Sequence, residues 1–292
     1  MKQPARPGSP SNNSRDISER PSASTLGEVS AALEVGDWRG GRLTSVSDRI
    51  IEEQAVALVY NGISHVVMMA TPDHLEDFAL GFSLTEGIIE SPSELYDIEL
   101  SKQDKGVQIA MQISTERFAS LKEVRRNMTG RTGCGLCGAE SLEQAIREPE
   151  PVSGAQQYSH DAIEHAVRYL EPNQPLQAVT GAVHGAAWCD DKGNIELVRE
   201  DVGRHNALDK LYGALCRDKA YINGEAGHFA LISSRASYEM VVKAAAMGVE
   251  MLVAVSAPTR LAIDVAQRVN ITLVGFARPG RHMVYTHPRR IV

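Results

Sequence analysis

Alternating apolar and polar positions dominate residues 37–128 and predict a small α+β domain. The runs 55–60 and 63–69 flank Asn61-Gly62, a dipeptide that strongly favours a two-residue β-hairpin turn. A helix is predicted over 71–87, because apolar residues recur every three to four positions, proline stands in the first turn, and glycine ends the pattern. Further predicted elements are strands at 95–100 and 107–113 and a helix from 115 to 127.

Residues 159–292 show a different pattern, in which helical and strand-like segments alternate. A hairpin is predicted over 182–199, between two helices centred on 163–170 and 208–215. The remaining predictions are strands at 229–233, 251–256 and 272–276, separated by helices over 237–247 and 259–269. Strands separated by helices imply parallel pairing with right-handed crossovers. The pattern therefore predicts an α/β domain.

Two segments lack such periodicity and complete the expected organisation. Residues 1–36 are rich in Ser, Pro, Arg and Asn, which predicts a disordered tail, with order beginning near Trp38. Residues 129–158 hold a glycine-rich loop with two cysteines, a short predicted helix near Glu140 and a proline-rich linker. The expected order is tail, α+β domain, loop with linker, and α/β domain.

Composition narrows the class of protein. The chain has 292 residues, 43% apolar, and a formal net charge of −7, which is typical of a globular protein and argues against a general nucleic-acid binder. No apolar run is long enough to span a bilayer, and no secretory signal follows the N-terminus. Four cysteines in a chain of this length do not form a disulfide scaffold, so we expect a cytoplasmic protein.

The strongest chemical signal is Cys134-Gly-Leu-Cys137, which is surrounded by glycines. Glycine reaches backbone angles that other residues avoid, so the two thiols are expected on a mobile, accessible loop. Basic residues lie just upstream, and positive charge favours the nucleophilic thiolate. This pattern indicates sulfur chemistry.

A lone Cys-x-x-Cys has several interpretations. A structural zinc ribbon needs further ligands, and Cys189 and Cys216 are isolated residues expected in the core. A thioredoxin-like redox pair opens a helix after a strand, whereas this pair follows a predicted helix. A persulfide carrier, which needs an exposed nucleophilic thiol, fits the loop best.

Three loops are predicted at one edge of the α/β sheet, where such sheets bind ligands. They are 233–237, 256–259 and 276–281. They bring hydroxyls, helix N-termini and the arginines Arg235, Arg260, Arg278 and Arg281. Backbone N–H groups at helix starts and arginine forks suit phosphate, so we expect an anionic, nucleotide-bearing ligand. The alternative is that the hydroxyls only cap helices and the arginines are solvated.

The string 200–210 gathers Arg204, His205, Asn206 and Lys210 near a predicted helix start. Asp201 could be the N-cap of that helix, but a cap does not explain the other polar residues. We expect a functional role for this string, including His205. His184, on a predicted strand, is interpreted as a half-buried residue of the fold.

The predicted order of the second domain resembles the cytidine-deaminase-like fold. Zinc deaminases carry H-x-E on the first helix and P-C-x-x-C before the second. This chain has His205-Asn206-Ala207 and Ser233-Ser-Arg-Ala-Ser237 there, so the catalytic carboxylate and both thiol ligands are missing. No catalytic zinc is expected.

Taken together, five motifs resemble the FdhD family of formate dehydrogenase accessory sulfurtransferases, from about residue 40 to the C-terminus. They are the runs 131–138, 200–210, 237–245, 256–259 and 284–287. Two positions depart from the family pattern: Ala182 and Ser234 stand where the family usually has glycine. Ser234 adds a side chain where glycine would let a ligand approach the backbone closely.

The resemblance implies a cytoplasmic sulfur carrier that takes persulfide sulfur from a cysteine desulfurase. The acceptor that the resemblance implies is the molybdenum bis(molybdopterin guanine dinucleotide) cofactor of formate dehydrogenase. Cys134 would carry the persulfide and Cys137 would take part in transfer. The expected acceptor-binding residues are His205, Ser233, Arg235, Ser256, Phe276, Ala277, Arg278, Pro279, Gly280 and Arg281. A homodimer is expected; the rival classes are a cofactor-binding chaperone with redox- or metal-binding cysteines, and a dithiol oxidoreductase.

Overall fold

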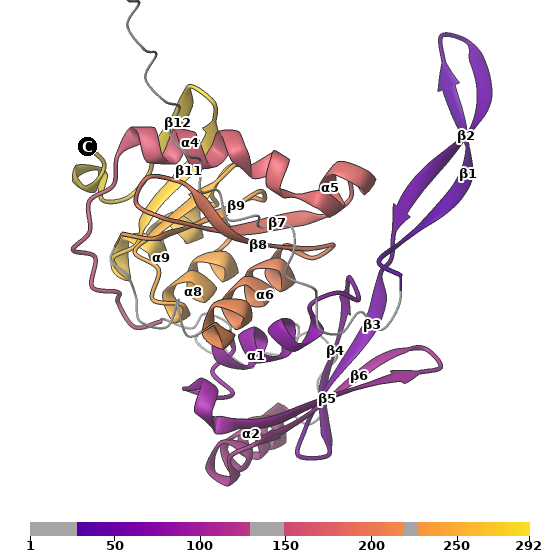
Figure 1. The fold of residues 1–292 in the computed structure, drawn as a ribbon. Helices are drawn as coiled ribbons and strands as arrows, with labels where there is room; N and C mark the ends of the chain where they lie inside the picture. Colours follow the sequence, from indigo (N-terminus) through magenta and orange to yellow (C-terminus); the bar gives the residue numbers. More distant parts are fainter. Residues whose placement is uncertain (1–27, 129–148, 219–226) are drawn as a thin grey trace, which may run out of the picture.

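The computed structural model describes residues 28–128, 149–218 and 227–292. They form two packed α/β units and a long hairpin that projects from them (Figure 1). The tail up to residue 27, the cysteine loop and the short helix expected near Glu140 lie outside the described residues.

The N-terminal unit is a four-stranded sheet with strand order β4-β3-β6-β5. The predicted Asn61-Gly62 turn is confirmed, because it joins β3 and β4, and both turn residues have positive φ. The elements are β3 (Gln54–Tyr60), β4 (Ile63–Ala70), α1 (Leu75–Thr85), η2 (Pro92–Glu94), β5 (Leu95–Gln103), β6 (Gly106–Ile113) and α2 (Thr115–Met128). β3 and β6 run parallel, and α1 buries its apolar side chains against the sheet.

Helix α1 begins later than its sequence pattern predicts. Its first residue is Leu75, not Thr71, and no side chain caps it. Thr71 is engaged elsewhere, because its hydroxyl accepts from the Val202 N–H and its carbonyl accepts from Lys210. Contacts with residues 131 and 139 positions later in the chain therefore hold Thr71 outside the helix.

The C-terminal unit is a six-stranded sheet with strand order β12-β11-β10-β9-β7-β8. β9, β10 and β11 are parallel, as predicted, and the β7–β8 hairpin flanks them. The elements are α4 (His160–Leu170), η3 (Glu171–Asn173), α5 (Pro175–Thr180), β7 (His184–Cys189), β8 (Ile195–Asp201), α6 (Arg204–Arg217), β9 (Phe229–Ile232), α8 (Tyr238–Ala246), β10 (Met251–Ala254), α9 (Arg260–Arg268), β11 (Thr272–Arg278), β12 (Arg281–Val284) and η4 (Pro288–Arg290). Side chains from α6, α8 and α9 pack on one face of the sheet and those from α4 on the other.

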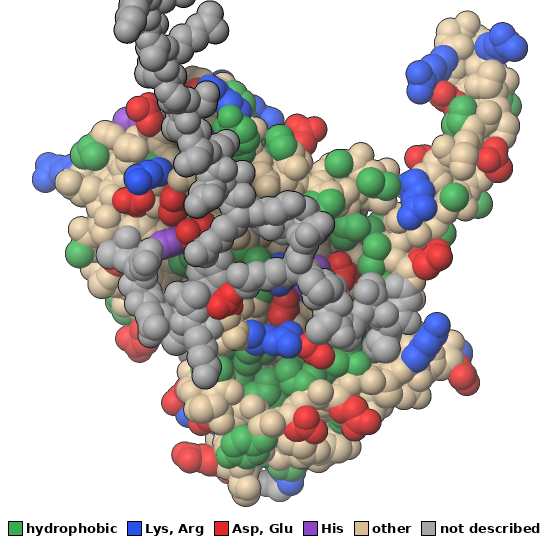
Figure 2. All heavy atoms as spheres, viewed as in Figure 1, with side chains coloured by type: hydrophobic (Ala, Val, Ile, Leu, Met, Phe, Trp, Pro, Cys, Tyr) green, Lys and Arg blue, Asp and Glu red, His purple; other side chains and the backbone are tan. Residues whose placement is uncertain are grey.

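The projecting hairpin corrects the expected tail boundary. Strands β1 (Ser30–Arg39) and β2 (Arg42–Ile51) pair in full register, so residues 30–36 are β-strand and not tail. We call this hairpin the arm; its tip projects away from both units, while β2 also contacts α5 of the C-terminal unit (Figures 1 and 2). Its pattern was missed because nearly every side chain of β2 is exposed and no buried core imposes strong alternation.

The two units share a close helix–helix contact between α1 and α6. The side chains of Tyr212 and Cys216, on α6, pack against the core of the N-terminal unit. Where the two helices cross, glycine from each faces the backbone of the other. The sequence predicted two domains, and the structure joins them through a packed interface.

Candidate functional site

The three predicted loops meet at one edge of the six-stranded sheet. The Val255 N–H donates to the carbonyl of Ile232 at 3.0 Å, so β10 and β9 end at the same level. The Thr259 N–H donates to Ala236 at 3.0 Å, which ties the second loop to the first. The Phe276 N–H donates to Ser256 at 3.1 Å and adds the third loop. The topology prediction for these loops is confirmed.

A cleft of about 700 Å³ opens at this edge. Four of the predicted acceptor-binding residues line it: Ser233, Ala277, Arg278 and Pro279. The opposite wall comes from α4, α5 and the segment that leads into β7, including Gln174, Gln177 and His184. The sequence pattern predicted helix α4 but not α5, although Pro175 at the first position of α5 is a helix-start signal.

The run 276–281 forms a bulged turn at the rim of the cleft. Phe276 has φ of 49°, an unusual conformation for an aromatic residue, and its side chain is 37% exposed. Pairing between β11 and β12 shifts at this point, between Gly275 and Arg278. Gly280, with φ of 77°, closes the turn and leads into β12 at Arg281. Strained backbone of this kind is enriched at ligand sites.

The arginines of the three loops are not equivalent. Arg278 lines the cleft, and Arg235 and Arg281 are exposed beyond it. None of these three forms an ion pair with another residue in the described part of the chain. Arg260 instead pairs with Asp264 one turn along α9, at 2.9 Å. Arg278 is therefore the arginine best placed for an anion in the cleft.

Two serines of the loops have structural hydrogen bonds. The Ser233 hydroxyl accepts from the Gly185 N–H at 2.9 Å, while the Ser233 N–H donates to the Gly185 carbonyl at 2.9 Å. Ser233 thereby fixes the end of β9 against the start of β7. Ser256 is half-buried and contributes its carbonyl to Phe276.

Glu200 holds the wall of the cleft that α5 forms in place. Its two carboxylate oxygens accept from the N–H groups of Leu176 and Gln177, both at 2.9 Å, at the N-terminus of α5. Burial raises the pKa of Glu200 above its ordinary value, although these hydrogen bonds oppose that effect. The Gln177 side chain in turn accepts from the Val183 N–H. Glu200 therefore connects β8 to the segment that faces Arg278.

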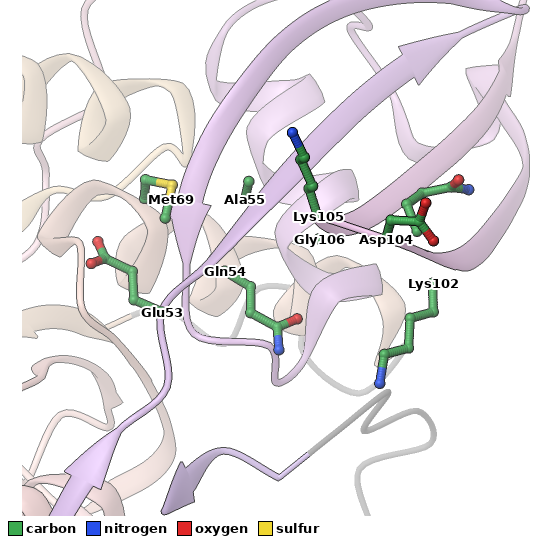
Figure 3. A pocket seen from close by; sticks show the side chains of 9 residues that line it. Glu53, Gln54, Ala55, Met69, Lys102, Asp104, Lys105 and Gly106 are labelled. Carbon is green, nitrogen blue, oxygen red and sulfur yellow. The ribbon is translucent and has the colours of Figure 1, made fainter.

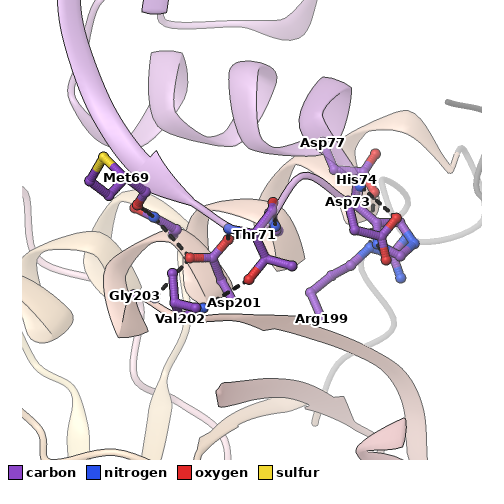
Figure 4. A network of polar contacts seen from close by, with 11 residues as sticks. Met69, Thr71, Asp73, His74, Asp77, Arg199, Asp201, Val202 and Gly203 are labelled. Atoms are coloured by element: carbon purple, nitrogen blue, oxygen red, sulfur yellow. Dashed lines mark hydrogen bonds and ion pairs between the residues drawn. The ribbon is translucent and has the colours of Figure 1, made fainter. Parts of the chain in front are cut away.

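Several residues of the string 200–210 build the junction between the two units, where Asp201 and Val202 lie against Thr71 (Figure 4). Asp201 accepts from the Thr71 N–H at 3.0 Å and from Asn206 Nδ2 at 2.9 Å. Lys210, fully buried, lies 2.6 Å from Asp201 and donates to the Thr71 carbonyl. Asn206 also donates to the Met69 carbonyl. The N-cap of α6 is Gly203, so the suggestion that Asp201 is the N-cap is wrong.

His205 does not line the cleft with the other predicted residues. Its Nε2 lies 2.7 Å from a carboxylate oxygen of Glu239, at the start of α8. Burial lowers the pKa of His205, and the charges of Arg204 and Lys243 act in the same direction, while Glu239 opposes them. His184, by contrast, is half-buried and does line the cleft. Burial, followed by the Arg204 charge, lowers the pKa of His184.

The isolated cysteines lie in or against the core, as expected. Cys189 is fully buried in β7, and burial raises its thiol pKa well above the ordinary value. Cys216 is half-buried in α6, and burial raises its pKa to about 11. A thiol with a raised pKa is a poor nucleophile at neutral pH. Cys134 and Cys137 lie outside the described residues.

A second, smaller hollow of about 370 Å³ lies where the arm joins the N-terminal sheet (Figure 3). It is lined by Glu53, Gln54, Ala55, Met69 and the turn 102–106. No predicted acceptor-binding residue borders it. The candidate site is therefore the larger cleft.

No three His, Cys, Asp or Glu side chains within residues 28–128, 149–218 and 227–292 are grouped to hold a metal ion. None of the helices in these segments combines the length and apolar character needed to cross a bilayer.

Comparison with known proteins agrees with the motifs. The sequence model of the FdhD/NarQ family matches residues 51–292. The chain belongs to the FdhD/NarQ family. It is 54% identical over 257 residues to the "Sulfur carrier protein FdhD" of Cupriavidus necator, with 88% of each chain covered. It is 49% identical over 271 residues to the protein of the same name from Xanthomonas euvesicatoria, covering 93% of this chain and 95% of that one.

A solved structure supports the FdhD/NarQ fold. A putative formate dehydrogenase accessory protein from Desulfotalea psychrophila superposes with a TM-score of 0.70 and 23% identity. The match covers 91% of this chain and all of the other. The shared feature is the mixed α/β fold with several sheets.

The two departures from the FdhD/NarQ pattern differ in their surroundings. Ser234 is 5% exposed, and its hydroxyl donates to the Arg235 carbonyl within its own loop. It does not line the cleft, so its side chain does not obstruct a ligand there. Ala182 is exposed and does line the cleft. Of the two, Ala182 is the one that faces the cleft.

Proposed function

We propose that this protein is a sulfur carrier that serves the maturation of formate dehydrogenase. In this proposal it receives sulfur from a cysteine desulfurase and delivers it to the molybdenum bis(molybdopterin guanine dinucleotide) cofactor. Relatives about half identical to it are named sulfur carrier proteins, which supports the transfer role. The proposal that this cofactor is the sulfur acceptor rests on the cleft at the sheet edge, which has Arg278 in its wall and Phe276 at its rim.

The proposed sulfur transfer takes place at the two loop cysteines in two steps. The Cys134 thiolate attacks the terminal sulfur of the donor's persulfide, so that Cys134 gains a sulfur atom and the donor leaves as a thiolate. The Cys137 thiolate then attacks the Cys134 sulfur and expels hydrosulfide, leaving a Cys134–Cys137 disulfide. The hydrosulfide replaces an oxygen ligand of the acceptor's molybdenum, which departs as hydroxide. A dithiol reductant restores the two thiols.

The residues of the cleft fit a phosphorylated, guanine-bearing acceptor. Arg278, which has no ion-pair partner among the described residues, supplies a guanidinium for a phosphate, and a guanidinium fork binds phosphate through two hydrogen bonds. The exposed ring of Phe276 offers a flat apolar face on which a base can stack. Gln174, Gln177 and His184 on the other wall supply polar groups for the pterin. The proposed acceptor therefore lies along the edge from β11 towards β7.

We further propose that the C-terminal unit is a cytidine-deaminase-like scaffold with a new role. Its β7–β8 hairpin, helix α6 and alternating strands and helices have the order expected for that fold. The positions of a deaminase's zinc ligands are occupied by His205 and by the serine-rich run 233–237. That set lacks the two thiolates, so we infer that the chain has no catalytic zinc there.

We propose that the arm binds a second copy of the chain. An isolated two-stranded hairpin is marginally stable in water and needs a covering surface. One face of the arm carries Leu33, Val46 and Ile50, at 57%, 38% and 42% exposure. The arm leads directly into β3, beside which Val67 and Met69 of β4 are also exposed. In a two-fold dimer, each arm would cover the apolar sheet face of the other copy.

The test of the transfer function is mass spectrometry of the full chain after incubation with a cysteine desulfurase and free cysteine. A gain of one sulfur atom, about 32 Da, on the peptide that contains Cys134 is expected. Cys134→Ala should lose that gain and fail to restore formate dehydrogenase activity in a strain that lacks the protein. Cys216→Ala is the matched control and should behave as the unchanged chain. Normal activity of the Cys134→Ala variant, or zinc bound by the two loop cysteines, would instead support the cofactor-binding chaperone.

A further inference from the structure

Glu171 differs from its neighbours in the cleft, because it is the only carboxylate among the described residues that line it. The walls of the cleft also hold two arginines, Arg168 and Arg278. Arg168 pairs with Glu164, one turn earlier on α4. The Glu171 carboxylate has no ion pair or hydrogen bond to any other described residue. A carboxylate repels phosphate, so it favours a phosphorylated ligand only if that ligand brings hydrogen-bond donors to it.

The backbone fixes the position of this carboxylate before a ligand binds. Glu171 follows the last residue of α4 and begins η3, with Pro172 next to it. Buried side chains, among them Val167 and Leu170, hold α4 on the sheet. The Glu171 carbonyl accepts from the N–H of Gln174, a buried residue, at 3.0 Å. The Glu171 side chain itself is exposed, so it is accessible to a ligand in the cleft.

Glu171 and Arg278 lie towards opposite ends of the cleft. The first residue of α4 lies beside His282 of β12. The far end of α4 leads through η3 to Gln174, which packs on β7 so closely that a Cβ atom on Gly185 would fall 2.3 Å from the Gln174 Nε2. β11, which ends at Arg278, is three strands from β7 in the order β11-β10-β9-β7, or about 14 Å. The two charges therefore face different parts of an elongated ligand.

The chemistry of a carboxylate indicates which ligand group Glu171 suits. An ionised carboxylate only accepts hydrogen bonds, and its two oxygens match two parallel N–H donors. An aminopyrimidinone ring offers such a pair, the ring N–H and the amino group beside it. The pterin and the guanine of the proposed acceptor both contain this ring. Adenine and hypoxanthine lack the pair, so a carboxylate at this position distinguishes between these rings.

We propose that Glu171 binds the aminopyrimidinone edge of the sulfur acceptor through the ring N–H and the amino group. This inference rests on the proposed function and names the residue that selects the acceptor's ring. With a phosphate at Arg278, the ligand places its pterin or its guanine at Glu171, and the same two donors bind in either case. A ring without the amino group makes one hydrogen bond fewer and binds more weakly.

The test compares ligands that differ at the position of the amino group. Guanosine diphosphate and inosine diphosphate form the guanine pair, and pterin and lumazine form the pterin pair. Isothermal titration of the full chain should give a dissociation constant about tenfold lower for the amino-bearing member of at least one pair, because its partner lacks a charge-assisted hydrogen bond. The pair that shows this preference identifies the ring at Glu171. Glu171→Gln should abolish the preference.

The sign of the change separates this contact from general electrostatics. If Glu171 only repels the ligand, Glu171→Gln should tighten the binding of both diphosphates. The proposal instead expects weaker binding, about tenfold, of the preferred amino-bearing ligand. Asp161→Asn is the matched control, because it removes the same charge from an exposed position of α4 that does not line the cleft. This control should keep the preference.

The outcomes against the inference differ from those against the proposed function. Equal affinities within both pairs for the unchanged chain would overturn the inference, as would a preference that survives Glu171→Gln. Either result would leave the cleft as the site of the acceptor. Failure of the unchanged chain to bind any of the four ligands would count against the cleft itself as the acceptor site.

Discussion

Gly81 of α1 and Gly213 of α6 lie against each other's helix backbone. A Cβ atom built on Gly81 would fall 1.7 Å from the Asp209 carbonyl oxygen, and one on Gly213 would fall 1.9 Å from that of Asp77. No real Cβ atom approaches backbone so closely. The two units are therefore joined at a crossing where only hydrogen fits, and their relative position depends on these two glycines.

Replacement of Gly81 by alanine should force the two helices apart. Overpacking of this kind costs about 3 kcal/mol of unfolding free energy. Gly87→Ala is the control, because its Cβ would meet nothing within 4 Å and only its positive φ is unfavourable, at about 1 kcal/mol. Urea denaturation of both variants measures the difference. Equal stability of the two would show that the helices move apart at little cost.

Replacement of Lys210 by methionine should destabilise the protein strongly. Lys210 and Asp201 are both fully buried, so the variant leaves a buried carboxylate without its cation. Breaking one side of such a pair costs about 4 kcal/mol. Lys192→Met, in the exposed β7–β8 turn, should change stability little. Adding Asp201→Asn to Lys210→Met should recover part of the loss, and a full double-mutant cycle in urea measures the coupling.

Stability should also depend on the pH through Asp209. Burial raises the pKa of this carboxyl to about 6, although Lys243 Nζ lies 2.9 Å from its Oδ1. Between about pH 4 and pH 6 the folded chain keeps a proton that the unfolded chain releases. The unfolding free energy contributed by Asp209 therefore falls as the pH rises through this window, by on the order of 3 kcal/mol.

Comparison with Asp209→Asn isolates this effect. The difference in unfolding free energy between the unchanged chain and the variant should shrink as the pH rises from 4 to 6, and then stay constant. Asp97→Asn, at an exposed carboxylate of β5, should show no such trend. A difference that stays flat across the window would mean that Asp209 is already ionised at pH 4 in the folded protein.

Local sequence patterns were sufficient to predict the parallel strands and the loops at their ends. The loop runs 233–237, 256–259 and 276–281 were expected at one edge because strands separated by helices must run parallel. Hydrogen bonds from Thr259 and Phe276 show that they meet. The proximity of Ser233, Ala277 and Arg278 follows from that topology, so these residues could be predicted without any contact information.

Other features depend on contacts distant in the chain and could not be predicted. The role of Asp201 and Lys210 at the junction requires Thr71, which lies 130 residues earlier. α5 is only six residues long and is held by Glu200 of β8, so its own periodicity carries little signal. Most side chains of the arm are exposed, and its residues up to 36 resemble a tail because no core selects their pattern.

Mutations on the arm should weaken association of two copies without affecting the fold. Leu33 and Val46 lie on the same face of the hairpin, whereas Ser47 lies on the opposite face. Val46→Glu should raise the dissociation constant of the dimer at least about tenfold, because a charge would be buried in the interface. Ser47→Glu should leave it unchanged. Sedimentation measures both, and a monomer in the unchanged chain would contradict the proposed dimer.

The arginines of the sheet edge give the sharpest test of the acceptor site. Arg278 lines the cleft without a counter-ion in the described part of the chain, while Arg260 does not line it and is paired with Asp264. Arg278→Gln should lower the affinity for guanosine diphosphate about tenfold, since a charged hydrogen bond to phosphate is lost. Because the site is open to solvent, this loss should be smaller at high salt.

Arg260→Gln is the matched control, because it removes the same charge from the same edge of the sheet. Isothermal titration of both variants at low and high salt distinguishes a specific contact from a general electrostatic attraction. An equal loss of affinity in the two variants would show that the edge attracts anions only through its summed charge. A loss confined to Arg278→Gln would place the nucleotide in the cleft, with its phosphates at the end of β11, and would fix the direction in which the acceptor extends.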